Sequence, residues 1–136
     1  MNRRAAGRGV AVSQESFDLL AACRRYSEQS EGTFDITVGP LMKVWGFYKG
    51  AGRMPHRSEV RTALSQIGYQ NLTLNPQTRT VRFAHNGLEM DPGGIGKGYA
   101  VDKMAAILRQ AGIQSAFVSA GGSSMFAIGA PADEPK

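Results

Sequence analysis

A glycine-dense stretch between an apolar segment and a helical pattern constrains this chain more than any other feature. Residues 88–102 read Leu-Glu-Met-Asp-Pro-Gly-Gly-Ile-Gly-Lys-Gly-Tyr-Ala-Val-Asp. A tight turn that leads into a helix leaves backbone N–H groups free, and the helix dipole adds positive potential. Lys97 adds a full charge at the same place. The stretch therefore predicts either a phosphate or nucleotide site or a purely structural strand-to-helix turn.

The stretch fits neither of two common phosphate motifs. A P-loop needs a glycine six residues before its lysine and Ser or Thr after it, and these positions hold Asp91 and Gly98. A dinucleotide fingerprint could begin at Gly94 and Gly96, but Tyr99 stands where its last glycine belongs. The usual nucleotide-binding folds are therefore excluded.

Composition indicates one ordinary globular domain. The chain has 136 residues, of which 42% are hydrophobic and 20% charged, enough for a real core. Its formal charge of +5 suits an anionic ligand, although a moderately basic surface explains it equally well. The sequence contains no basic run with interleaved aromatic residues that would predict nucleic-acid binding. It also contains no apolar run that approaches the ~20 residues of a membrane span. The single cysteine, Cys23, is expected to be buried on a helix.

Caps and glycines mark the expected helices. Ser13 is the expected N-cap of the first helix, and Gly32 closes it. Pro40 suits the first turn of a short helix, and Ser58 is expected to cap another. A last helix runs from about residue 97 to Gly112. Gly68 is expected to end the helix that begins at Ser58. The residues of this helix expected to face inward are Val60, Ala63, Leu64 and Ile67.

Strand patterns fill most of the remaining chain. Asn75-Pro76 reads as a turn, and Asn86-Gly87 is a strong hairpin signal. Trp45, Phe47 and Tyr48 are expected to be packing residues rather than ring-stacking partners of a ligand. The order of elements predicts an α+β fold with a mixed sheet and packed helices. The expected strands are residues 72–74, 80–83, 88–91, 115–119 and 124–128.

Three motifs, in order over essentially the whole chain, resemble those of the ApbE family. The first is Gly-Thr-Phe-Asp-Ile-Thr-Val-Gly-Pro-Leu at 32–41, followed by Trp45-Gly46. The second is the stretch 91–102, and the third is Val-Ser-Ala-Gly-Gly at 118–122. The resemblance implies an ApbE-like, T-fold-related domain, of which residues 1–136 are a part.

The family resemblance also implies an activity. Members of the ApbE family are FAD:protein FMN transferases. With the help of Mg²⁺ they split FAD, attach FMN to a Thr or Ser hydroxyl of an acceptor protein and release AMP. The implied partner is an acceptor such as a redox-complex subunit. The implied location is the periplasm, as an inner-membrane lipoprotein, or the cytoplasm without an export signal; the chain itself carries no anchor signal.

The resemblance assigns roles to six positions but no catalytic residue. Gly94 would offer its carbonyl to Mg²⁺, and Lys97 would lie near the FAD pyrophosphate. Structural interpretations stay open, because Phe34 suits a core, Asp35 a turn cap, and Lys97 a solvated first turn. Asp91 could equally brace the glycine turn. The residues implied to line or contact the FAD site are Thr33, Phe34, Asp35, Asp91 and Lys97.

The third motif and the length depart from the family pattern. Ser119-Ala120 replaces an expected Asn-Leu, and Ser123 stands where a second asparagine is usual. The family's first FAD contacts, its histidine motif and its Mg²⁺-holding Asp/Thr cluster have no counterpart in residues 1–136. We therefore expect part of a domain or a truncated product that binds Mg²⁺ weakly alone. The alternatives are a non-catalytic flavin-binding module and an inactive truncated chain.

Overall fold

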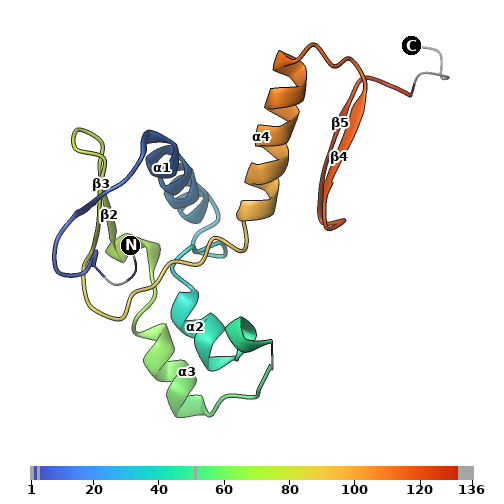
Figure 1. Cartoon of the computed structure of the whole chain (residues 1–136). Helices are drawn as coiled ribbons and strands as arrows, with labels where there is room; N and C mark the ends of the chain where they lie inside the picture. The colour runs from blue at the N-terminus through green and yellow to red at the C-terminus, as the bar shows by residue number, and fades with distance from the viewer. Residues whose placement is uncertain (1, 3, 51, 132–136) are drawn as a thin grey trace. The chain divides into compact units, whose positions relative to one another are not determined.

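The computed structural model describes residues 2, 4–50 and 52–131. The chain divides into two compact units, Met1–Asp91 and Pro92–Lys136, which are described separately below (Figure 1). Helices and antiparallel strands make up both units, as the predicted α+β class requires. Among the described residues, no helix has the length and apolar character needed to cross a membrane.

The first unit contains a three-stranded antiparallel sheet. Strand β3 (Thr80–Phe83) lies in its centre, between β1 (Val10–Ala11) and β2 (Leu72–Asn75). Strand β2 pairs with β3 through Leu72 opposite Phe83, and both side chains are buried. The Asn75 carboxamide accepts hydrogen bonds from the next turn's backbone, which confirms the predicted turn between β2 and β3.

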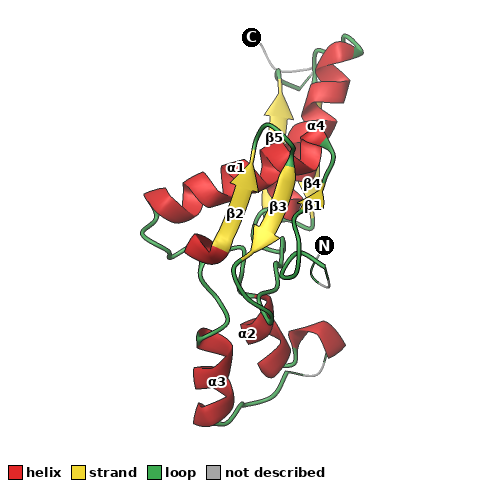
Figure 2. Ribbon diagram, turned by 90° about the vertical axis from the view of Figure 1, so that its left-hand side faces the viewer, coloured by secondary structure: helices red, strands yellow, loops and turns green. Residues whose placement is uncertain are grey.

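Helix α1 (Gln14–Gln29) lies across this sheet (Figure 2). The Ser13 hydroxyl accepts from the Ser16 N–H at 3.2 Å, so the predicted N-cap is confirmed. Gly32 has a φ of 83° and its N–H donates to Ser27 O at 2.8 Å, a left-handed stop that glycine adopts without strain. Cys23 is fully buried, as predicted, and burial raises the pKa of its thiol to about 11.

Helices α2 (Gly39–Val44) and α3 (Arg57–Leu64) pack together, joined by the short helix η1 (Phe47–Lys49). The prediction that Ser58 caps α3 is wrong. Position His56 is the N-cap, and its N–H donates to Glu59 Oε2 at 2.8 Å. The expected continuation to Ile67 is also wrong, since α3 ends at Leu64, whose side chain is 51% exposed rather than inward.

Residues 88–91 do not form the second strand of the hairpin that was predicted at Asn86-Gly87. Strand β3 already has a partner on each side, so the chain after Gly87 cannot pair with it. Instead it lies parallel to residues 36–39: Gly39 N donates to Glu89 O at 3.1 Å, and Asp91 N to Ile36 O at 2.8 Å. A single bridge forms, Val38 with Glu89, where a strand over 88–91 was expected.

The second unit consists of α4 and one hairpin. Helix α4 (Gly96–Gln110) packs against β4 (Ala116–Ala120) and β5 (Ser124–Ile128), with Val101 and Val118 buried. The strands pair antiparallel from Ala116–Ile128 to Ala120–Ser124. Both turn glycines, Gly121 and Gly122, have positive φ values of 62° and 74°. The predicted strand 124–128 is confirmed, and the preceding strand begins one residue later than predicted.

Candidate functional site

The Thr33-Phe34-Asp35 motif follows directly after α1. Thr33 is exposed, and its hydroxyl donates to Ser30 O. Phe34 is half-buried, and its ring meets Tyr26 edge-on with 6.5 Å between ring centroids. Phe34 is therefore not a fully buried core residue, and part of its surface is open to solvent.

The Asp35 carboxylate holds three protein donors. Its Oδ1 accepts from Thr37 N at 2.8 Å and Thr37 Oγ1 at 2.7 Å, and its Oδ2 accepts from Tyr69 N at 2.9 Å. Thr37 is fully buried and accepts in turn from Gly68 N at 2.8 Å. Asp35 thus braces the first motif against residues 68–69, which supports its interpretation as a structural cap. Its contact with FAD stays a prediction.

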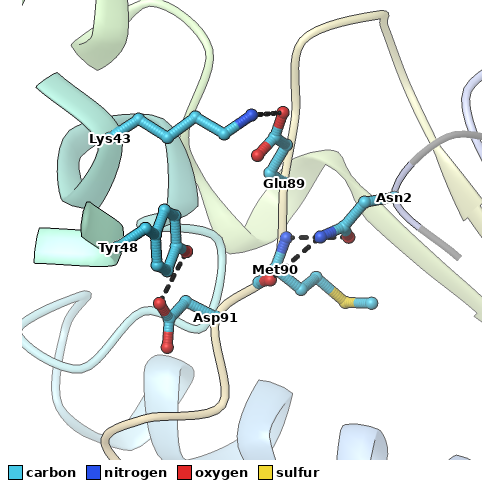
Figure 3. A network of polar contacts seen from close by, with 6 residues as sticks. All are labelled: Asn2, Lys43, Tyr48, Glu89, Met90 and Asp91. Atoms are coloured by element: carbon cyan, nitrogen blue, oxygen red, sulfur yellow. Dashed lines mark hydrogen bonds and ion pairs between the residues drawn. The ribbon is translucent and has the colours of Figure 1, made fainter. Parts of the chain in front are cut away.

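Asp91 is held through both backbone and side chain. Its N–H bonds Ile36 O, and its Oδ2 accepts from the Tyr48 hydroxyl at 2.6 Å (Figure 3). Burial raises the pKa of the Tyr48 phenol, and the Asp91 carboxylate raises it further, so the hydroxyl keeps its proton at neutral pH. Tyr48 is 53% exposed, so the expectation that it is only a packing residue is wrong, as it is for Phe47 at 60%.

The two residues before Asp91 have their own side-chain partners. Lys43 from α2 makes an ion pair with Glu89, and Asn2 exchanges two hydrogen bonds with the Met90 backbone, at 3.1 and 3.2 Å (Figure 3). Three consecutive residues are therefore fixed by three separate parts of the first unit. We call this set the Asp91 corner: Asn2, Lys43, Tyr48, Glu89, Met90 and Asp91.

In the second unit, the glycine turn leads straight into α4. Pro92 O accepts from Ile95 N at 3.0 Å and Gly96 N at 2.8 Å, which closes the turn around the exposed Gly94. Lys97 lies in the first turn of α4, where positive charge opposes the helix dipole. A lysine there is better placed when an anion lies beside it.

Lys97 reaches the turn of the β4–β5 hairpin. Its Nζ donates to Ser123 Oγ at 3.2 Å, and a Cβ built on Gly121 would lie 3.8 Å from the same nitrogen. The second and third sequence motifs thus meet at one ammonium group. We call Lys97, Gly121, Gly122 and Ser123 the lysine clamp.

The structure brings predicted residues together within each unit. Within the first unit, Ile36 links the Thr33–Asp35 motif to Asp91; within the second, Gly94 and Lys97 share the start of α4. Sequence reasoning missed the roles of Tyr48 and Ser123. Their partners lie 43 and 26 residues away, so no local spacing could reveal them. The only hint for Ser123 was its departure from the family pattern.

The described residues offer little to a metal ion on their own. No group of three or more His, Cys, Asp or Glu side chains in residues 2, 4–50 and 52–131 is arranged to hold one. The Gly94 carbonyl, in an exposed turn, is a hard oxygen of the kind Mg²⁺ accepts. One carbonyl is too few for a site, so the Mg²⁺ role of Gly94 stays a prediction.

Comparison with known proteins agrees with this arrangement. The sequence profile of the ApbE family matches residues 1–136. An FAD:protein FMN transferase of Klebsiella pneumoniae (strain 342) is 29% identical over 123 residues, covering 90% of this chain and 39% of the relative. The crystal structure of the ApbE protein of Thermotoga maritima superimposes with a TM-score of 0.86 at 36% identity, covering 94% of this chain and 41% of that one.

A second solved structure, the apo form of Pseudomonas stutzeri flavinyl transferase ApbE, gives a TM-score of 0.81 at 32% identity. It covers 93% of this chain and 40% of that one. The fold and the three motifs define a flavin-transferase-like α+β domain. The chain belongs to the ApbE family. It spans about two fifths of the length of the relatives it matches.

Proposed function

We propose that this chain forms part of an enzyme that transfers FMN from FAD to a Thr or Ser hydroxyl of an acceptor protein. Relatives that match most of the chain are named FAD:protein FMN transferases. The predicted flavin residues occur in both units of the chain, and none of them is completely buried. Their partial exposure supports a role in binding a ligand.

One observation carries the proposal: the lysine clamp. The Lys97 ammonium donates a hydrogen bond to Ser123 beside the start of a 15-residue helix, directly after a glycine turn. The charge of Lys97 and the dipole of the helix both favour the same kind of ligand, an anion with several oxygens. The pyrophosphate of FAD has this chemistry.

The proposed reaction is a transfer at phosphorus. The acceptor hydroxyl oxygen forms a bond to the phosphorus of the FMN moiety. The bond between this phosphorus and the bridging pyrophosphate oxygen breaks, and AMP leaves with that oxygen. The hydroxyl proton passes to water. In this reaction Lys97 would hold the pyrophosphate and balance the charge that grows on the leaving AMP. Magnesium would supply further charge neutralisation, but the described residues do not make its site.

A comparison of flavins with and without phosphate tests whether the chain binds the pyrophosphate of FAD. We expect FAD to bind more tightly than riboflavin, which has no phosphate, when each is titrated and followed by flavin fluorescence. Lys97→Ala should weaken FAD binding about 10-fold, the effect of one charge-assisted contact, and leave riboflavin unchanged. Lys103→Ala is the matched control, because Lys103 lies on the same helix with its ammonium 5.2 Å from the Tyr99 ring. Equal affinity for FAD and riboflavin would contradict the pyrophosphate site.

Transfer is tested by weighing the acceptor. The chain is incubated with FAD, MgCl₂ and a threonine-bearing acceptor domain, with and without EDTA. A mass gain of one FMN that EDTA abolishes supports a magnesium-dependent transferase. FAD that binds with unchanged affinity in EDTA and stays intact instead supports the flavin-binding module.

A further inference from the structure

We infer that Tyr48 is a positioning residue: it orients the Asp91 carboxylate for the flavin. The inference rests on the proposed function, in which Asp91 contacts FAD. It gives a role to residues 47–56, an excursion without periodicity that no motif explains.

The first step is the contact itself. The Tyr48 hydroxyl lies 2.6 Å from Asp91 Oδ2, within the range of charge-assisted O–H···O⁻ hydrogen bonds. The phenol is the donor at neutral pH because it keeps its proton. The carboxylate therefore receives a bond of fixed direction, and this bond favours one of the three staggered orientations open to an aspartate side chain.

The second step is how Tyr48 reaches Asp91. Gly46 and Gly50, on either side of η1, both take left-handed backbone angles, with φ of 75° and 67°. Each lets the chain turn sharply without a Cβ penalty. The two turns project the Tyr48 side chain toward Asp91 (Figure 3). The local sequence Gly-Phe-Tyr-Lys-Gly thus builds this contact.

The third step separates orientation from architecture. The backbone of Asp91 is already placed by its hydrogen bond to Ile36 O. Glu89 is placed by the hydrogen bond from Gly39 N and by its ion pair with Lys43. We expect the Tyr48 contact to add little to the path of the chain, because it lies at the surface and the Asp91 backbone has its own hydrogen bond to Ile36 O. What it adds is the direction of one carboxylate.

A double-mutant cycle on FAD binding tests this inference. Tyr48→Phe removes the hydroxyl and keeps the ring, and we expect it to weaken FAD binding about 3- to 10-fold, the typical effect of one hydrogen bond. Asp91→Asn should weaken binding at least as much. If Tyr48 acts through Asp91, the double variant binds like Asp91→Asn alone. The midpoint of thermal unfolding should stay unchanged in Tyr48→Phe.

Tyr69→Phe is the matched control, because its hydroxyl makes no hydrogen bond within the described residues. Additive effects of the two substitutions, or full affinity in Tyr48→Phe, would overturn the positioning role and leave the proposed function standing. If the parent chain binds no FAD, the flavin site itself fails, and the inference with it. Should Asp91→Asn fail to fold, Asp91→Ala takes its place in the cycle.

Discussion

The ammonium of Lys97 donates a hydrogen bond to the hydroxyl of Ser123, 26 residues further along the chain, at 3.2 Å. This bond joins the start of α4 to the turn of the β4–β5 hairpin. The bond should lower the entropy cost of binding an anion, because it restricts the Lys97 side chain before the anion binds. A serine that replaces a usual asparagine of the family thereby becomes part of the proposed pyrophosphate site.

Ser123→Ala should weaken FAD binding about 2- to 5-fold, since Lys97 then loses its anchor and must be ordered by the ligand. Fluorescence titration measures this. Ser115→Ala is the control, because that hydroxyl bonds Ala130 O and does not touch Lys97. An unchanged affinity in Ser123→Ala would show that Lys97 needs no anchor.

Gly39→Ala should destabilise the first unit by about 2–3 kcal/mol, as overpacking does. A Cβ at this position would lie 2.7 Å from Glu89 O, which is main-chain and cannot move aside alone. Urea unfolding measures the free energy. Gly7→Ala is the control, because a Cβ there meets nothing within 4 Å. Equal stability of both variants would refute the tight contact between residues 39 and 89.

Asp35→Asn should lower the free energy of unfolding by about 1–3 kcal/mol, because the carboxamide keeps only one acceptor oxygen for the part-buried donors of Thr37 and Tyr69. Glu31→Gln, an exposed change nearby, should have little effect. Urea unfolding and FAD titration of the same variants separate two interpretations. Unchanged stability with weakened FAD binding would show that Asp35 serves the ligand and not the fold.

Acid should loosen the start of α3 through Glu59. Its hydrogen bond from Arg53 and the one from His56 N lower the pKa of the carboxyl from 4.5 to about 2. A folded-state pKa below the unfolded one gives stabilisation that is complete above pH 4.5 and is lost as pH falls toward 2. Glu59→Gln should therefore flatten the pH dependence of unfolding over this window, and Glu31→Gln should not. The effect is small because the ion pair is exposed to solvent.

Local chemistry predicted some of the turns and helix ends. Ser13 and Gly32 were correct because a cap and a left-handed stop depend on neighbouring residues alone. The hairpin at Asn86-Gly87 was wrong for the opposite reason. The dipeptide favours the turn, but β3 had both edges occupied by strands from elsewhere, and only the tertiary arrangement shows this. The N-cap of α3 was also predicted wrongly: His56 holds that position, and its N–H donates to Glu59, which pairs with Arg53.

The site shows the same division. The three motifs pointed to Thr33–Asp35, Asp91, Gly94 and Lys97, and the roles of these residues toward FAD and Mg²⁺ stay predictions. Tyr48 could not be found in this way. It belongs to a segment with no periodicity, and only the approach of residues 36–39 to residues 89–91 brings its hydroxyl near a carboxylate.

The parallel contact between residues 36–39 and 89–91 also sets an order of assembly. The Asp91 corner closes only when the chain has formed a loop from Tyr48 to Asp91, 43 residues apart, whereas β2 and β3 meet across a short turn. We expect the corner to be the last part of the first unit to form and the first to open. Hydrogen exchange should then be faster at the amide of Asp91 than at that of Val81, and the reverse order would contradict it. A ligand bound at Asp91 would slow this opening and lengthen the lifetime of the folded unit.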